Sequence, residues 1–95
     1  FHARALNNLG VWLDRHGRTD EAVRMLRRAI AADPENAEAY SNLGSALIGA
    51  RRLPEALQAL DTAVALDPEA ADAHNNRGIA LAQSGRLPEA IAEFT

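Results

Sequence analysis

One residue type recurs in this chain at a spacing that could support recognition chemistry. Asn8, Asn42 and Asn76 lie 34 residues apart. An asparagine amide has one acceptor oxygen and two donor hydrogens, so it can bind both polar groups of a peptide backbone without selecting a side chain. The fixed spacing predicts that equivalent elements stack these amides in a row. The amides could instead satisfy a neighbouring helix or water, and the sequence leaves both interpretations open.

The other reactive side chains do not indicate catalysis or metal binding. His2, His16 and His74 lack the spacing of metal ligands, and the chain has no cysteine. No phosphate-binding loop, Ser/His/Asp set or catalytic pair of carboxylates can be argued. We therefore predict a chain that is not an enzyme and holds no metal or cofactor. A catalytic domain of the parent protein would lie outside these residues.

Composition and charge argue against nucleic acid and membranes as partners. The formal net charge is -3, and all ten basic residues are arginine. Residues 1–34 hold six of these, whereas residues 35–95 carry four Arg against nine Asp and Glu. These 95 residues contain neither a signal-peptide pattern nor a long apolar run. The absence of cysteine fits a reducing compartment, and we expect a cytoplasmic protein. Arg24, Arg27 and Arg28 could meet an acidic partner, but a solvated face is the favoured interpretation.

The 34-residue period extends well beyond the asparagines. It relates Gly10, Gly44 and Gly78; Leu13, Leu47 and Leu81; Glu21, Glu55 and Glu89; and Ala22, Ala56 and Ala90. Such a period is typical of a solenoid, in which one supersecondary unit stacks on copies of itself. We predict one domain over residues 1–95. Because arrays usually need about three units, we expect it to be a piece of a longer array.

Each period predicts two helices. Tyr40, Leu43 and Leu47 recur on one helical face, and a second apolar stripe follows Pro54. Gly17 and Gly85 are expected to end first helices in a left-handed turn. The predicted helices span residues 3–16, 20–32, 37–50, 54–66, 71–84 and 88–95. The glycines inside the first helices predict close helix crossings, since each costs about 1 kcal/mol against alanine.

The combined pattern resembles the tetratricopeptide repeat family. The matching positions are Leu6, Leu9, Gly10, Leu13, Ala22, Leu26, Ala29 and Pro34; then Tyr40, Leu43, Gly44, Leu47, Ala56, Leu60, Ala63 and Pro68; then His74, Gly78, Leu81, Ala90 and Phe94. The resemblance implies an all-α right-handed solenoid of antiparallel helix pairs. Its repeats would be 3–36, 37–70 and a partial 71–95.

Three residues depart from the family pattern. Arg77 replaces a usual leucine, and Arg51 replaces a helix-ending glycine. Trp12 stands where Ala46 and Ala80 stand in the later repeats. These positions mark where the structure could differ from an ordinary array.

The resemblance also implies a binding site, because first helices of the family line a concave groove. The candidate peptide-binding residues are Asn8, Asn42, Asn76, Asn7, Ser41, Asn75, Arg4, Ser45 and Ile79. Their row is similar to the asparagine ladder of O-GlcNAc transferases and kinesin light chains. Chaperone-type members grip a terminal carboxylate, but only Asn42 matches that set, so this ligand is not expected.

The sequence therefore predicts a protein–protein interaction scaffold that binds an extended peptide in its groove. One alternative is self-association, giving a homo-oligomer through exposed solenoid ends that include Trp12 and the partly exposed Leu81, Ile91 and Phe94. Another is the substrate-presenting region of a larger enzyme, such as a glycosyltransferase.

Overall fold

Five helices follow one another along the chain. The structure, a computed structural model, describes residues 2–86 and residue 93. The helices are α1 (Ala3–Arg15), α2 (Thr19–Ala32), α3 (Ala37–Gly49), α4 (Leu53–Leu66) and α5 (Ala71–Gln83). Each bound lies within one residue of its prediction, and the described residues contain no β-strand. The all-α class is confirmed. Of the helix predicted over 88–95, only Glu93 is described, and it is helical.

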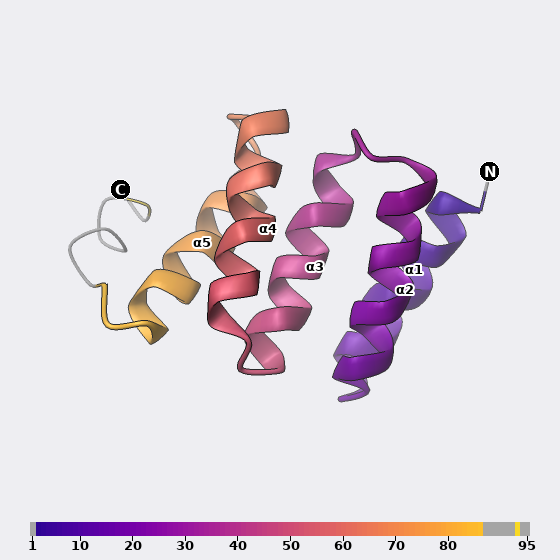
Figure 1. The fold of residues 1–95 in the computed structure, drawn as a ribbon, viewed down its shortest axis with the longest axis horizontal. Helices are drawn as coiled ribbons and strands as arrows, with labels where there is room; N and C mark the ends of the chain where they lie inside the picture. Colours follow the sequence, from indigo (N-terminus) through magenta and orange to yellow (C-terminus); the bar gives the residue numbers. More distant parts are fainter. Residues whose placement is uncertain (1, 87–92, 94–95) are drawn as a thin grey trace.

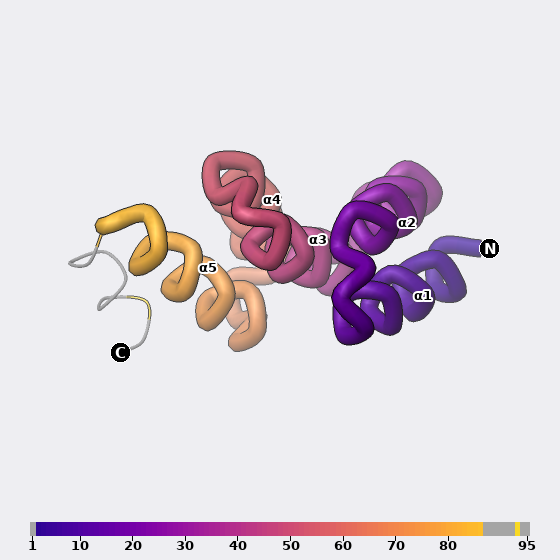
Figure 2. Tube along the Cα trace, turned by 90° about the horizontal axis from the view of Figure 1, so that it is seen from below, coloured from indigo at the N-terminus to yellow at the C-terminus, as the bar shows by residue number. Residues whose placement is uncertain are grey.

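The helices form two layers (Figure 1). α1, α3 and α5 make one layer, while α2 and α4 make the other, as the second view also shows (Figure 2). Within each repeat the two helices pack together, and the second helix also packs against the first helix of the next repeat. α1 contacts α3 and α3 contacts α5, but α2 and α4 have no Cα atoms within 8 Å of each other. The first-helix layer is therefore continuous and the second-helix layer is not.

The three first helices end in the same left-handed turn. The backbone φ angles are 76° at Gly17, 63° at Arg51 and 81° at Gly85. In α1 the Gly17 N–H donates to the carbonyl of Asp14 at 3.1 Å, and the next N–H donates to the carbonyl five residues before it at 2.9 Å. This pair of bonds is a Schellman turn, in which glycine is favoured. The two predicted glycine ends are confirmed, and Arg51 adopts the same conformation without glycine.

Two interior glycines lie where the helices of a repeat cross. A Cβ atom added to Gly10 would come within 2.5 Å of Leu26 Cγ. One added to Gly44 would come within 2.5 Å of Leu60 Cγ. Such distances are far inside van der Waals contact, so each helix pair can approach this closely only with glycine. The predicted close crossings are confirmed at both positions.

The core continues from one repeat into the next. Its buried apolar residues are Leu13, Ala22, Val23, Leu26, Leu43, Ala46, Leu47, Ala56 and Ala59. Ala22 and Ala56, which share one repeat position, are fully buried. No helix among the described residues is long and apolar enough to cross a membrane.

The expectation for Leu81 was wrong, since its side chain is 0% exposed. Leu81 shares its repeat position with Leu13 and Leu47, which are also buried. This position is buried in all three repeats, so its place in the repeat decides its burial, not its distance from the end of the chain. Ile91 and Phe94 lie outside the described residues. Trp12 is 49% exposed on α1, as expected.

Candidate binding groove

The predicted asparagine row lies on the first-helix layer, and two of its amides link neighbouring helices. Asn42 Nδ2 on α3 donates to Asn7 Oδ1 on α1 at 3.0 Å. Asn76 Nδ2 on α5 donates to the backbone oxygen of Ser41 at 3.4 Å and to its Oγ at 3.3 Å. Both asparagines remain partly exposed, and Asn8 is exposed. No described hydrogen bond uses the Oδ1 atoms of Asn42 and Asn76, so both oxygens still have acceptor capacity.

The residues one place earlier in the repeat lie deeper. Asn7 and Ser41 are each 4% exposed, between adjacent first helices. Asn7 also donates to Glu38 Oε1 at 3.2 Å, so its carbonyl and its amino group are both engaged. Asn75, the third residue of this set, is exposed. Asn7 and Ser41 therefore act mainly as the hydrogen-bonding partners of Asn42 and Asn76, and offer little surface of their own.

The other predicted site residues are spread along the same layer. Arg4 is exposed on α1, and Ile79 is partly buried on α5. Ser45 Oγ on α3 donates to Asp14 Oδ2 on α1 at 3.5 Å. Burial raises the pKa of the Asp14 carboxyl, and the hydrogen bond from Ser45 acts against that rise. Ser45 is thus a further polar link between α1 and α3.

Two clefts recur along this layer at the repeat spacing. The first has a volume of about 710 Å³ and is lined by Ala3, Arg4, Asn7, Asn8, Ala32, Asp33, Asn36 and Glu38. The second, of about 250 Å³, is lined by Ala37, Glu38, Ser41, Asn42, Asp67, Ala70, Ala71 and Asp72. Most members of the second set lie 34 residues after a member of the first. In the described residues, a cleft therefore lies between the starts of α1 and α3 and another between the starts of α3 and α5.

The charge of these clefts changes from one repeat to the next. Arg4, Glu38 and Asp72 occupy the same repeat position on α1, α3 and α5. The lining of the first cleft contains one cation, Arg4, together with Asp33 and Glu38, whereas the lining of the second contains carboxylates and no cation. The described residues include no group of three His, Cys, Asp or Glu that could hold a metal ion. The clefts offer hydrogen bonds and charge, which suits recognition.

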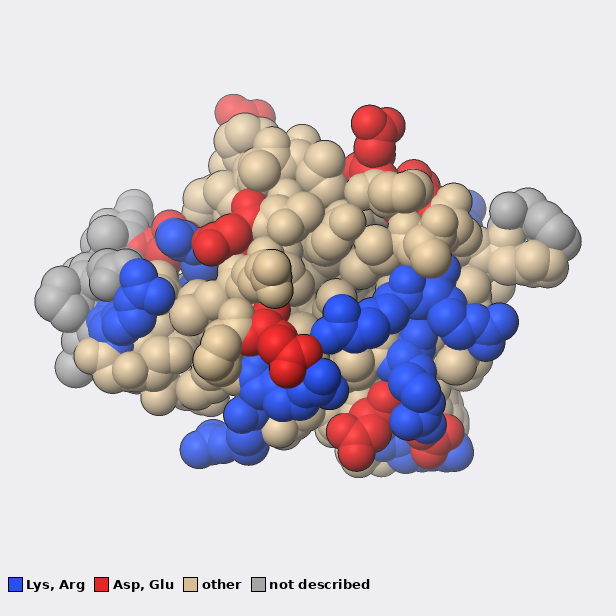
Figure 3. Space-filling model, in the orientation of Figure 1, with Lys and Arg blue, Asp and Glu red and all other residues tan. Residues whose placement is uncertain are grey.

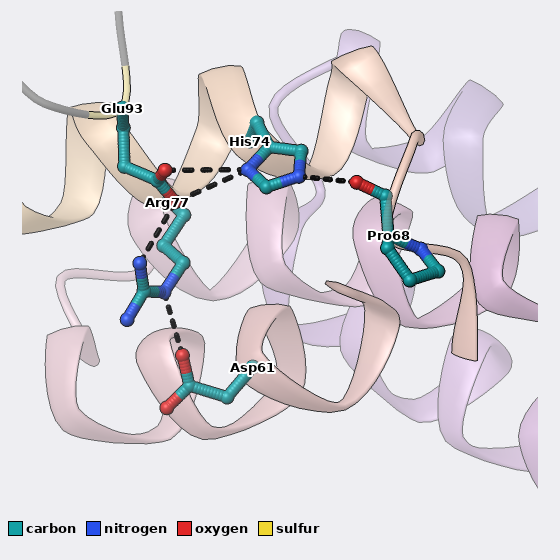
Figure 4. Close-up of polar contacts among 5 residues, drawn as sticks. All are labelled: Asp61, Pro68, His74, Arg77 and Glu93. Atoms are coloured by element: carbon teal, nitrogen blue, oxygen red, sulfur yellow. Dashed lines mark hydrogen bonds and ion pairs between the residues drawn. The ribbon is translucent and has the colours of Figure 1, made fainter. Parts of the chain in front are cut away.

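A polar network lies at the far end of the solenoid (Figure 4). Arg77 Nε on α5 donates to Asp61 Oδ1 on α4 at 2.6 Å, and its Nη1 donates to Glu93 Oε1 at 2.8 Å. His74 lies between Glu93 Oε2, at 3.2 Å from Nδ1, and the Pro68 carbonyl, at 2.7 Å from Nε2. Arg77, the departure from the family leucine, thus exchanges an apolar contact for two ion pairs.

The network shifts the pKa values of its members. The Pro68 carbonyl, followed by Glu93, raises the pKa of His74 above its ordinary value, because both favour the protonated ring. Burial pushes the pKa of Glu93 up, but Arg77 and His74 together hold it below its ordinary value. In the sequence, His74 stands only at the repeat position of Tyr40 and lacks the spacing of a metal ligand. Its partners lie 6 and 19 residues away, and no sequence pattern indicated them.

Comparison with known proteins agrees with this architecture. A family model described as a tetratricopeptide repeat matches residues 8–68 and again 43–95. A search of curated proteins found no match. Among solved structures, the second TPR of Spaghetti (RPAP3), bound to the HSP90 peptide SRMEEVD, has 29% identity and a TM-score of 0.92. That match covers 98% of this chain and 86% of the other.

A second similar structure is a longer protein. MamA from Desulfovibrio magneticus RS-1, from residue 41 to its end, has 30% identity and a TM-score of 0.91. The match covers 98% of this chain but 52% of that one, so this chain spans about half the length of that MamA chain. The family model, the glycine crossings and the two-layer array agree, and the chain belongs to the tetratricopeptide repeat family.

Proposed function

We propose that this chain binds an extended segment of a partner protein along the layer formed by α1, α3 and α5. The observation that carries the proposal is the recurrence of a cleft at the 34-residue spacing, each next to a partly or fully exposed asparagine. Adjacent helices lie about 8–10 Å apart, and an extended peptide advances about 3.3 Å per residue. Neighbouring clefts would therefore meet about every third residue of the ligand.

The polar groups of the groove favour contact with a peptide backbone. The Oδ1 atoms of Asn42 and Asn76 can accept from peptide N–H groups while their Nδ2 atoms hold the neighbouring helix. The Spaghetti structure supports peptide binding by this architecture, since its second TPR is bound to the HSP90 peptide. Lysine is absent from this chain, and only Asn42 matches the set that grips a terminal carboxylate. An internal segment is the proposed ligand.

The experiment is an array of overlapping nonapeptides, followed by calorimetric titration of the strongest binder. Asn8→Ala should weaken binding by about 0.5–1.5 kcal/mol, the net value of a typical hydrogen bond. Asn8 is exposed and makes no hydrogen bond to the described residues, so the fold should not change. Asp20→Asn, which changes an exposed polar side chain on α2 outside the clefts, is the control. Equal affinities for the wild type and both variants would refute the groove assignment.

A specific observation supports self-association as a second candidate. Leu9 and Trp12 on α1 are 44% and 49% exposed, and the Trp12 ring stacks on His16 with centroids 4.0 Å apart. The equivalent residues on α3, Leu43 and Ala46, are 4% and 0% exposed on the helix that packs against α2. Leu9 and Trp12 thus occupy repeat positions that are buried between helices in the next repeat. On α1 both positions are exposed, and one of them carries an aromatic ring.

Sedimentation across a hundredfold range of concentration tests this candidate. We expect the wild-type chain to increase in mass with concentration and Trp12→Ala to do so less, because an exposed indole contributes much of the apolar area. A wild-type chain that stays monomeric throughout would exclude this candidate and would leave the groove proposal standing.

A further inference from the structure

A third cleft lies on the opposite side of the molecule from the groove, between α2 and α4. It has a volume of about 290 Å³ and is lined by Arg27, Tyr40, Leu43, Leu47, Glu55, Gln58, Ala59 and Thr62. α3 supplies the floor, because α2 and α4 do not approach each other closely enough to cover it. The floor is apolar except for the Tyr40 hydroxyl. This volume is near the lower limit of small-molecule clefts, about 300 Å³, and suits one or two side chains of a partner.

An ion pair crosses the mouth of this cleft. Arg27 Nη2 on α2 lies 3.0 Å from Glu55 Oε2 on α4. Arg52 binds the same carboxylate through both oxygens, at 3.0 and 2.7 Å. Because Glu55 has this second, bidentate partner, it stays paired if Arg27 turns to another carboxylate. The arrangement leaves Arg27 able to exchange partners at little cost.

The charge around the cleft is unusual for this acidic chain. The middle of α2 carries Arg24, Arg27 and Arg28, whereas Asp20 and Glu21 lie in its first turn. Arg24 and Arg28 are exposed, and neither forms an ion pair within the described part of the chain. Arginine side chains gather over α2 and beside the start of α4 on this face (Figure 3). A local excess of cations borders an apolar floor.

We propose that this cleft between α2 and α4 is a second protein-binding surface, which takes an apolar side chain flanked by carboxylates. The apolar group would lie on the α3 floor formed by Tyr40, Leu43 and Leu47, and the flanking carboxylates would pair with the arginines of α2. Charge complementarity selects an acidic segment. A nucleic acid fits less well, since it would place its phosphates beside Glu55 and use none of the apolar floor. This surface is separate from the groove.

A fluorescent peptide tests the proposal by anisotropy. The probe has leucine at its centre and two aspartate or glutamate residues on each side. The double variant Arg24→Glu/Arg28→Glu should bind the probe about tenfold more weakly, because two attractions become repulsions. The matched control, Arg4→Glu/Arg15→Glu, makes the same change of charge on α1 and should leave this affinity within about twofold, since the charges lie far from the cleft.

A third variant should raise the affinity for the probe. Glu55→Gln removes the carboxylate that occupies Arg27 and Arg52, so the probe should bind about two- to threefold more tightly. Replacing the central leucine of the probe with serine should abolish most of the binding, because the apolar floor then has no partner. Circular dichroism of each variant confirms that the helices persist.

The remaining outcomes would overturn the proposal. If the α1 control binds the probe as weakly as the α2 variant does, the attraction comes from the overall charge of the protein and not from this cleft. If only the α1 control loses it, the peptide occupies the groove, which supports the proposed function instead. Equal affinity for the serine probe, or for an oligonucleotide of equal charge, would show that the apolar floor is not used. An absence of wild-type binding would also overturn it.

Discussion

Replacing Arg51 with glycine should stabilise the fold. Arg51 has a φ of 63° in a turn where the equivalent residues are Gly17 and Gly85. A left-handed conformation costs an L-residue about 1–2 kcal/mol. Glycine removes this cost but adds about 0.4–1 kcal/mol of chain entropy to the unfolded state. Arg51 is exposed and has no ion pair among the described residues, so no contact is lost. The expected gain is about 0.5–1 kcal/mol.

Urea denaturation and thermal melting measure this gain. For a domain of this size, 1 kcal/mol shifts Tm by about 4–8 °C, so Arg51→Gly should melt about 2–8 °C higher. Arg51→Ala is the control, because it removes the side chain but keeps the left-handed strain, and its Tm should stay close to that of the wild type. Gly17→Ala should lower stability by about 1 kcal/mol. Equal stabilisation by glycine and alanine at position 51 would refute the backbone argument and indicate that the arginine charge is responsible.

Three further predictions concern packing, pH and the groove. Gly44→Ala should destabilise the fold by about 1–3 kcal/mol in urea, since its Cβ would press on Leu60; an unchanged midpoint would contradict the crossing. The pKa of His74 is raised in the folded state, so its stabilising effect is complete below the unfolded pKa of about 6.5 and is lost as pH rises through the folded value. Unfolding midpoints should therefore fall from pH 6 to 8, and His74→Gln should flatten the profile; an equal slope in that variant would exclude His74 as the cause. Asn42→Ala should cost about 1–3 kcal/mol of stability, because it leaves the buried oxygen of Asn7 unpaired; a loss of peptide affinity without a loss of stability would show that the interhelical bond is dispensable.

Much of the fold could be predicted because the sequence contains glycines that lower helix stability, and a close helix crossing or a left-handed turn explains why they are there. The helix-interior glycines predicted close crossings, which Gly10 and Gly44 make with Leu26 and Leu60. Gly17 predicted a left-handed helix end, because few other residues adopt positive φ without strain. Each of these constraints acts on a single residue, so the residue type and its position in the repeat are enough to reveal it.

The links between helices could not be predicted in the same way. Asn42 bonds to Asn7, and Asn76 to Ser41, each 35 residues away and not 34. That offset depends on how far one first helix is rotated against the next, which the repeat period does not specify. The ion pair of Arg77 with Glu93 likewise depends on the register of two elements. The sequence identified the asparagine row, but it could not tell which atoms face a neighbouring helix and which face solvent.

The two layers of the molecule are held together to different degrees, and this has a mechanical consequence. Polar bonds tie α1 to α3 and α3 to α5, while the described side-chain bridge between α2 and α4 is the exposed pair of Arg27 and Glu55. Bending of the array should therefore pivot on the first-helix side and change mainly the separation of α2 and α4. Tension along the axis would first widen the gap between α2 and α4, while the spacing of the asparagines stays nearly constant.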